Sequence, residues 1–271
     1  MNAFFKKIVA AAILAVTCGL VFAYGEPPIG WTVISGASTS NVKFYKKNGS
    51  EVYAQVVNMG AGAKIELKQT KVGMTGGFNT YSRSSIETWY AGAGNPVSVV
   101  NGDFFNQGID PTTISFAIRS NGVLVEPGGE PNANKRQIEF YTGQGALVIA
   151  ASAWRIANGT TAQNAMGGHA PVDAPSPAAP RGRTTLCTLS PSSPSPLFLI
   201  LVHGSALQSQ VNTDLVSWKC NSGSEIVMDG SASSQMGYKV NGTTVYFKGS
   251  HDGTLPGVGR AIPQVIVIRN I

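Results

Sequence analysis

Four short polar segments of this sequence combine residue types that could hold and cleave an anionic ligand. They are Asn101-Gly102-Asp103-Phe104-Phe105, Pro180-Arg181-Gly182-Arg183-Thr184-Thr185, Asp229-Gly230-Ser231-Ala232-Ser233-Ser234 and Gly259-Arg260. Each lies next to an apolar run that predicts a strand, and catalytic groups are often found on loops at strand ends. Together they supply carboxylates, an amide, arginines and hydroxyls. Because arginine offers a planar fork for phosphate oxygens, this set favours a hydroxylated anion such as a sugar phosphate.

The sequence lacks the common signatures of metal, nucleotide and serine-hydrolase chemistry. It contains no Walker-type phosphate loop and none of the patterns HExxH, GxSxG, CxxC or GxGxxG. His169, His203 and His251 are too scattered for a zinc site to be argued from spacing. We therefore expect no cofactor, although a divalent cation beside Asp229 stays open.

The order of the polar segments resembles the phosphodiester glycosidase family. The shared pattern is Asn-Gly-x-Phe-Phe, then Arg-Thr, then Asp-Gly-x-x-Ser-Ser, then an arginine with a proline three residues later. The resemblance covers residues from about 95 to 271. It implies a hydrolase that splits the sugar C1–O bond of a glycosyl phosphodiester and releases a sugar and a phosphomonoester. The implied partner is a sugar phosphodiester or a phosphorylated glycan.

The resemblance also implies roles for the charged residues. Asp229 is expected to stabilise an oxocarbenium-like centre or to position water. Arg183 and Arg260 are expected to hold the phosphate, where negative charge must be stabilised as the monoester departs. Arg181 directly follows the proline and competes with Arg183 for this role.

The remaining candidates are expected to contact the substrate. The amide and hydroxyl side chains of Asn101, Ser233 and Ser234 would hold sugar hydroxyls or phosphate oxygens. The glycines Gly102 and Gly230 match the motifs. Two further candidates are Asp103, at a position that the family leaves variable, and His251.

Two features depart from the family pattern. Ser231 and Ala232 replace glycines of the family's Asp-Gly-Gly-Gly-Ser-Ser loop, and His203 stands where family members often have aspartate. If those glycines serve a positive φ or a close approach of phosphate, side chains here would strain or crowd the loop. The alternative function is therefore an inactive exported module that keeps the fold and binds a glycan or a protein.

The N-terminus has the three parts of a secretory signal peptide over residues 1–23. Lys6 and Lys7 precede an apolar run over residues 8–22, and Val21 and Ala23 are small enough for cleavage after Ala23. The alternative is a membrane anchor, but the run is shorter than the roughly 20 residues of a typical span. We expect an exported protein, periplasmic or secreted, with one domain over residues 24–271 and no stable membrane insertion after cleavage.

Charge and cysteine content are consistent with this expectation. Removing Lys6 and Lys7 lowers the formal net charge from +6 to +4, and no run of Lys and Arg is present, so the sequence does not favour nucleic-acid binding. Cys187 and Cys220 remain after cleavage, and two thiols in an oxidising compartment are expected to pair. The sequence leaves the oligomeric state open.

The elements that must position these residues are mostly short strands, which predicts an α+β fold with a mixed, β-rich sheet, several hairpins and a few flanking helices. Alternating strands are expected at 41–47, 51–58 and 63–70. Hairpins are expected around Asn121-Gly122, Gly143-Gln144-Gly145 and Asn241-Gly242, because Asn and Gly tolerate positive φ. Central strands buried on both faces are expected at 96–100, 197–202 and 265–268.

Two helices and one long loop complete the sequence-based expectation. The helices are expected at 78–91 and at 213–220, the second with Asn212 as its N-cap. Residues 167–183, rich in Pro, Ala and Gly, are expected to form a loop that is either functional or disordered.

Overall fold

The computed structural model describes residues 26–128, 134–150, 153, 155–157, 159–190, 192–221, 223–253 and 257–270. The predicted signal peptide and its cleavage site lie outside the described residues. Within the described ranges, no helix is long and apolar enough to cross a membrane.

The largest element of the fold is an 11-stranded sheet, and its described strand pairs are antiparallel. Its main path follows, in spatial order, β1 (Trp31–Val33), β2 (Val42–Lys47), β3 (Val52–Asn58), β14 (Leu197–Ala206), β13 (Arg181–Thr188), β15 (Glu225–Val227), β12 (Asn164–His169), β10 (Lys135–Tyr141) and β11 (Gly145–Ala150). Off this path, β8 (Ile118–Ser120) pairs with β12 and with β9 (Val123–Glu126).

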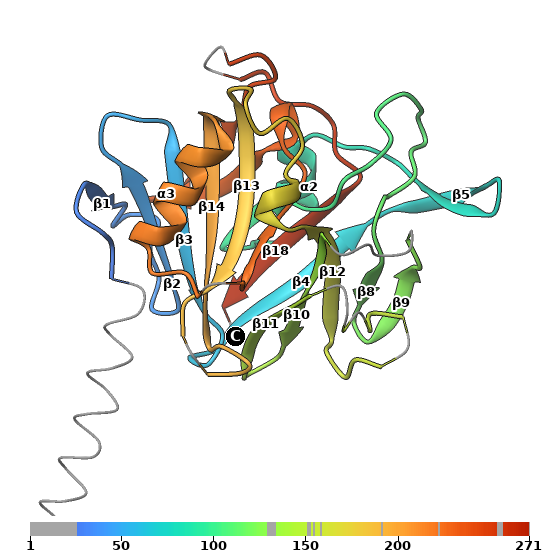
Figure 1. The fold of residues 1–271 in the computed structure, drawn as a ribbon, viewed down its shortest axis with the longest axis horizontal. Coiled ribbons are helices and arrows are strands. Elements are labelled where there is room, and N and C mark those ends of the chain that lie inside the picture. The colour runs from blue at the N-terminus through green and yellow to red at the C-terminus, as the bar shows by residue number, and fades with distance from the viewer. Residues whose placement is uncertain are drawn as a thin grey trace, which may run out of the picture.

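A second sheet has five strands, which are also antiparallel. Its spatial order is β17 (Thr243–Lys248), β16 (Gln235–Val240), β7 (Ser98–Asn101), β18 (Gln264–Asn270) and β4 (Ala63–Gln69). A separate hairpin of β5 (Lys71–Thr75) and β6 (Phe78–Tyr81) projects from the body of the molecule (Figure 1). The predicted β-rich fold is confirmed, but it contains several sheets, and their described strand pairs are antiparallel and not mixed.

The main hydrophobic core contains side chains of both larger sheets. Phe44 and Ile200 of the 11-stranded sheet belong to the same buried cluster as Met236 and Ile266 of the five-stranded sheet. The rings of Phe44 and Tyr238 stack at 5.1 Å and link β2 to β16. This cluster fixes the two sheets relative to each other, and the polar motifs lie at strand ends beside it.

Two helices add a second cluster of buried side chains to each sheet. Helix α3 (Gln208–Ser217) packs Val211 and Leu215 against residues of β3 and β14, on the face of the 11-stranded sheet nearest the viewer in Figure 1. Helix α2 (Ile86–Gly92) packs Ile86 and Tyr90 with residues of β7 and β18. The expectation of a few flanking helices is confirmed, although the fold is mostly β.

The predicted disulfide is present. Cys187 on β13 and Cys220, just beyond α3, are bonded with their Cα atoms 5.9 Å apart. The bond ties the end of the helix to the centre of the 11-stranded sheet. Cys187 is fully buried in the cluster that α3 covers.

Most predicted strands are confirmed, including the three hairpins. The hairpins are β8–β9, β10–β11 and β16–β17, and Asn121 and Asn241 take the positive φ values of 49° that their turns need. The strands expected to be buried on both faces correspond to β7, β14 and β18. Each of these lies between two neighbours in its sheet.

Both predicted helices are misplaced. Residues 78–81 form β6, and α2 begins only after Ser85, whose Oγ accepts from the backbone N–H of Thr88 at 3.3 Å. Helix α3 begins at Gln208, because Gln210 Oε1 accepts from the backbone N–H of Leu207 at 2.8 Å and so caps the first turn. Asn212 is therefore an internal helix residue and no cap.

The predicted loop over residues 167–183 is shorter than expected. Strand β12 continues to His169 and β13 begins at Arg181. Between them, a 3-10 turn, η2 (Pro171–Asp173), starts the connection. The remaining loop residues lie beside the cavity described next.

Candidate functional site

Asn101 joins three of the four motifs where their strands end. It is the last residue of β7, and its side chain is buried. Its Nδ2 donates to the backbone oxygen of Asp229 at 2.8 Å, and its Oδ1 accepts from Thr184 Oγ1 at 2.7 Å. The same Oδ1 accepts from the backbone N–H of Gln235 at 3.0 Å. These hydrogen bonds pair the donor and acceptor atoms of the Asn101 amide within the protein, so Asn101 holds the three motifs together beside the site.

The paired serines occupy the same buried junction. Ser233 and Ser234 are both fully buried, and Ser234 Oγ lies 3.1 Å from Thr184 Oγ1. The wall of the neighbouring cavity is made by other residues. Ser234 is therefore placed to hold the loop, and neither serine lines the cavity. The sequence had predicted contact with a ligand for both.

Two motif glycines allow close packing at this junction. A Cβ on Gly102 would lie 1.5 Å from Gln264 Oε1, the atom that accepts from the backbone N–H of Asp103 at 2.8 Å. A Cβ on Gly182 would lie 2.2 Å from the backbone oxygen of Ser231. Larger residues at either position would push the loops apart, which explains why the chemistry-bearing loops carry glycine there.

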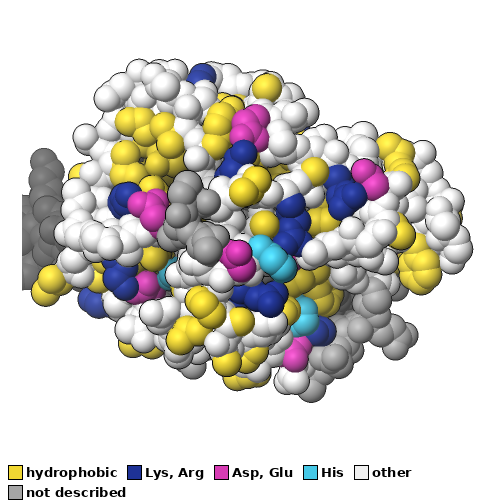
Figure 2. All heavy atoms as spheres, turned by 90° about the horizontal axis from the view of Figure 1, so that it is seen from above, with side chains coloured by type: hydrophobic (Ala, Val, Ile, Leu, Met, Phe, Trp, Pro, Cys, Tyr) yellow, Lys and Arg dark blue, Asp and Glu magenta, His cyan; other side chains and the backbone are white. Residues whose placement is uncertain are grey.

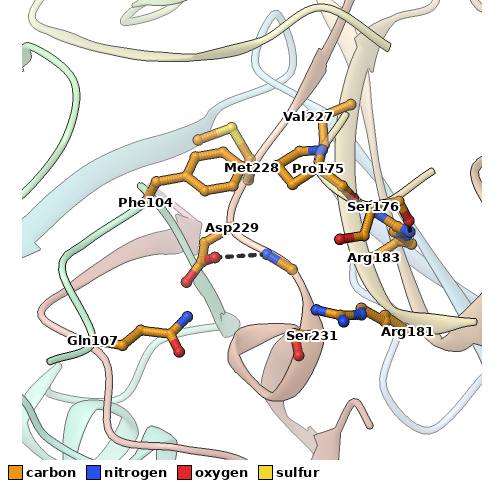
Figure 3. Close-up of a pocket in the computed structure, with 11 residues that line it drawn as sticks. Phe104, Gln107, Pro175, Ser176, Arg181, Arg183, Val227, Met228, Asp229 and Ser231 are labelled. Carbon is orange, nitrogen blue, oxygen red and sulfur yellow. Dashed lines mark hydrogen bonds between the residues drawn. The ribbon is translucent and has the colours of Figure 1, made fainter. Parts of the chain in front are cut away.

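A cavity of about 160 Å³ lies beside this junction, at the end of the molecule where β13 begins. Figure 2 views that end and shows Lys, Arg and His side chains gathered near its centre. Eleven residues line the cavity (Figure 3): Phe104, Gln107, Pro175, Ser176, Arg181, Arg183, Val227, Met228, Asp229, Gly230 and Ser231. This volume is below the roughly 300–1,000 Å³ of drug-sized pockets, so it suits a small part of a ligand.

Asp229 is the carboxylate in this wall. It is 7% exposed, and its Oδ1 accepts from the backbone N–H of Gly230 at 2.9 Å. Within the part of the chain that is described, its Oδ2 is buried and has no hydrogen-bond partner. Burial raises the pKa of Asp229 to about 6, and the nearby Ser233 hydroxyl and the positive charge of Arg260 oppose that rise.

Asp103 lies close to Asp229 but behind the cavity wall. It is 2% exposed, and its Oδ1 accepts from the backbone N–H of Phe104 at 2.6 Å. Burial raises the pKa of Asp103 well above its usual range, and the negative charges of Asp229 and Glu126 raise it further. A raised pKa favours the neutral carboxyl, which suits a supporting position better than a charged contact with substrate.

Arg183 uses its guanidinium to hold the loop beside the cavity. It is 3% exposed, its Nη1 donates to Pro175 O at 2.6 Å, and its Nη2 donates to Ser176 O at 2.5 Å and Ala179 O at 3.0 Å. Its Nε donates to Ala206 O at 3.3 Å. These carbonyl groups occupy most of its donors, so few donors of Arg183 remain for a ligand.

Arg181 is the arginine that points into the cavity. Figure 3 shows its guanidinium directed toward the centre, near Ser231, whereas that of Arg183 lies beside Ser176. The register between β13 and β14 shifts between Arg181 and Arg183, and this bulge separates two side chains that regular alternation would place on one face. Among the described residues, the Arg181 guanidinium has no hydrogen bond or ion pair.

Arg260 approaches the same site from the loop before β18. Its Nη2 lies 3.3 Å from Ser231 Oγ and 3.4 Å from His251 Nδ1. Burial lowers the pKa of Arg260, the nearby charge of Arg181 lowers it further, and Asp229 opposes this. An arginine remains protonated in proteins, so the site gathers two cations around one carboxylate.

Ser231 has a backbone conformation that favours glycine, the residue that the family pattern has at this position. Its φ is +61°, in the left-handed region that favours glycine. The residue begins the 3-10 turn η3 (Ser231–Ser233), and its Oγ lies 2.6 Å from His251 Nδ1. The expectation of strain at a substituted glycine position therefore agrees with the local geometry.

The other two histidines do not line the cavity. His203 is buried, and its Nε2 lies 3.0 Å from Asp214 Oδ2 of α3. His169 pairs with Asp173, with 2.7 Å between Nδ1 and Oδ2. Within the described ranges, no group of three or more His, Cys, Asp or Glu side chains is arranged to hold a metal ion.

Several cavity residues were not proposed from the sequence. Pro175 and Ser176 belong to the loop that was expected to be functional or disordered, so its length and composition were a usable signal. Phe104 belongs to a recognised motif, and its ring lies 4.7 Å from that of His169. Gln107 gave no signal, because an isolated polar residue in a loop is common.

Comparisons with known proteins identify a shared fold. No protein-family model matches the sequence, and no curated protein matches it. Among solved structures, the chain is similar to the catalytic domain of zebrafish N-acetylglucosamine-1-phosphodiester alpha-N-acetylglucosaminidase, auto-inhibited by its pro-peptide, with a TM-score of 0.55 and 15% identity over 92% of this chain and 86% of that chain. A hypothetical protein from Synechocystis gives a TM-score of 0.45 and 9% identity over 85% of this chain and 62% of that chain, too low to support an argument.

Proposed function

We propose that this chain is an exported hydrolase that cleaves the sugar C1–O bond of a glycosyl phosphodiester, with the reaction taking place in the Asp229 cavity. The observation that carries the proposal is the unpartnered Oδ2 of Asp229 in a small cavity that Arg181 lines and that Arg260 adjoins through Ser231. The fold shared with the zebrafish phosphodiester glycosidase supports the choice of reaction.

The arginines account for binding and for departure of the phosphate. Arg181 presents a guanidinium without a protein partner among the described residues, and Arg260 is held nearby by Ser231. A phosphodiester bound between them would have its charge neutralised, and the negative charge of the departing monoester would be stabilised. Arg183 contributes indirectly, because it fixes the loop that carries Pro175 and Ser176.

Asp229 accounts for the chemistry at carbon. With a pKa of about 6, it is mostly ionised at neutral pH. Its free oxygen can stabilise positive charge at C1 or orient the attacking water, as carboxylates do in glycoside hydrolysis. Asp103 and Asn101 support it from behind, Asn101 through the bond to the backbone oxygen of Asp229.

Export is part of the proposal and rests on two observations. The N-terminal sequence has the pattern of a signal peptide, and the Cys187–Cys220 bond is of a kind that persists in oxidising compartments.

A binding module on the same fold is the second candidate. The observation that favours it is Ser231, whose side chain enters the cavity wall at a position where the family pattern has glycine. Such a module would bind a phosphorylated glycan in the cavity without turnover.

Sugar release from glycosyl phosphodiesters tests the proposal. We expect the purified protein to release free sugar, and Asp229→Asn to lose at least about 100-fold in rate, because an electrostatic contact of this kind is worth roughly 10²–10³. Glu51→Gln is a suitable control, because it removes an exposed carboxylate that lines a different pocket. Binding of sugar 1-phosphate without release by the wild type would instead favour the binding module.

A further inference from the structure

Ser231 and His251 form a close pair beside the cavity that cleavage at C1 does not use. Their Oγ and Nδ1 atoms are 2.6 Å apart, although the residues come from different loops. Ser231 lines the cavity itself. A hydroxyl held within hydrogen-bond reach of an imidazole is the arrangement of an activated nucleophile.

Arg260 fixes the direction of this hydrogen bond. An arginine side chain can only donate, and its Nη2 lies 3.3 Å from Ser231 Oγ and 3.4 Å from His251 Nδ1. We therefore assign Nδ1, beside that cation, as the acceptor of the hydroxyl proton. His251 is thus placed to receive the proton that Ser231 must lose in order to attack.

The charges around Ser231 suit an anionic electrophile. Arg260 Nη1 is buried and has no hydrogen-bond partner in the described part of the chain. Arg181 approaches the same point in the cavity (Figure 3). Two guanidinium groups beside the nucleophile can donate to the two non-bridging oxygens of a phosphodiester, whose shared negative charge would otherwise repel an incoming alkoxide.

The backbone at Ser231 is consistent with a functional position. A φ of +61° is unfavourable for serine, and residues held in such conformations cluster at active sites. Nucleophilic serines on sharp, strained turns occur in unrelated hydrolases. If residue 231 served only to turn the chain, glycine would suit the position better.

We propose that Ser231 is a nucleophile toward the phosphorus of phosphodiesters, with His251 as its base, and that the cavity thereby has a second activity. Ser231 Oγ forms a bond to phosphorus, the bond from phosphorus to one ester oxygen breaks, and the hydroxyl proton passes through His251 to the departing oxygen. Water then attacks phosphorus and His251 takes its proton. The bond between Oγ and phosphorus breaks, His251 returns a proton to Oγ, and the phosphomonoester leaves.

Reaction with bis(4-nitrophenyl) phosphate tests this activity separately from the proposed cleavage at C1, because this compound has no sugar. We expect a burst of 4-nitrophenolate and a 4-nitrophenyl phosphoryl adduct on the peptide that contains Ser231, identified by mass spectrometry. Ser231→Ala and Ser231→Gly should abolish both. His251→Gln, which keeps an acceptor but no base, should slow the burst at least about 100-fold.

Ser209→Ala is the matched control, because Ser209 is an exposed serine of α3 that does not line the cavity, so its loss should leave the burst unchanged. Ser231→Gly guards against a folding artefact, because glycine adopts the local φ readily. The absence of an adduct in the wild type, an adduct on another residue or a wild-type burst in Ser231→Gly would overturn the proposal. Sugar release is measured in a separate assay, so the loss of one activity can be told apart from the loss of the other.

Discussion

Replacing Arg183 by methionine separates a residue that holds the cavity wall from one that binds phosphate. Arg183 is 3% exposed and donates to the backbone oxygens of Pro175, Ser176, Ala179 and Ala206. Methionine fills a similar volume but leaves those oxygens without their donor. We therefore expect the substitution to act first on stability and on the loop over residues 175–179.

The magnitude follows from those contacts. A hydrogen bond to a charged group contributes about 1.5–3 kcal/mol, but bonds that share one side chain are not additive, and rim carbonyl groups can be solvated. We expect Arg183→Met to lower the free energy of unfolding by roughly 3–5 kcal/mol. A loss of about 4 kcal/mol corresponds to a fall in Tm of roughly 8–16 °C for a chain of this size.

The matched substitution is Arg181→Met, two residues earlier in the same strand. The Arg181 guanidinium has no partner among the described residues, so we expect the free energy of unfolding to stay within about 0.5 kcal/mol of the wild type. Its affinity for a sugar 1-phosphate should fall about 10- to 100-fold, because one charge-assisted contact is lost.

Urea unfolding and calorimetric titration with a sugar 1-phosphate measure both effects. An Arg183→Met protein with wild-type stability and no phosphate binding, together with an Arg181→Met protein that still binds, would refute the assignment. Arg183 would then be the phosphate ligand that the sequence motif suggested.

Three further predictions concern stability. Because burial raises the pKa of Asp229 from 3.8 to about 6, the folded state binds this proton more tightly, and the stabilisation present below pH 4 is lost as the pH rises through 6. Urea unfolding should therefore show the wild type losing about 2–3 kcal/mol relative to Asp229→Asn between pH 4 and pH 8, and parallel curves would contradict the raised pKa. Reduction of the Cys187–Cys220 bond should lower the free energy of unfolding by about 2–4 kcal/mol, measured with and without dithiothreitol, and an unchanged midpoint would contradict its structural role. Ser231→Gly should raise the free energy of unfolding by up to about 1 kcal/mol, because it relieves a left-handed φ, whereas a clear loss of stability would show that the strain is absent.

The sequence predicted the parts of the fold that depend on local interactions. The Asn-Gly turns at Asn121 and Asn241 require positive φ in two adjacent residues, and the Asn-Gly pair in the sequence indicates this directly. The helix starts were missed because their signals are weak: Ser85 caps α2 only through its bond to Thr88, and a leucine occupies the N-cap position of α3.

The site was predictable in its location and less so in its roles. Three of the four motifs meet at Asn101, as their place at strand ends suggested. The difference between Arg181 and Arg183 depends on a bulge and on where a distant loop places its carbonyl groups. The pair of Ser231 and His251 depends on two loops that are adjacent only in the folded chain.

The destination of oxygen from water tests the central claim, cleavage of the C1–O bond, most directly. The measurement is hydrolysis of a glycosyl phosphodiester in water enriched in oxygen-18 by Ser231→Gly, which lacks the hydroxyl that could attack phosphorus. If the bond from C1 to oxygen breaks, the phosphomonoester contains only ordinary oxygen, and the heavy oxygen enters the sugar. Heavy oxygen in the phosphomonoester would show that the bond to phosphorus breaks and would contradict the proposed reaction.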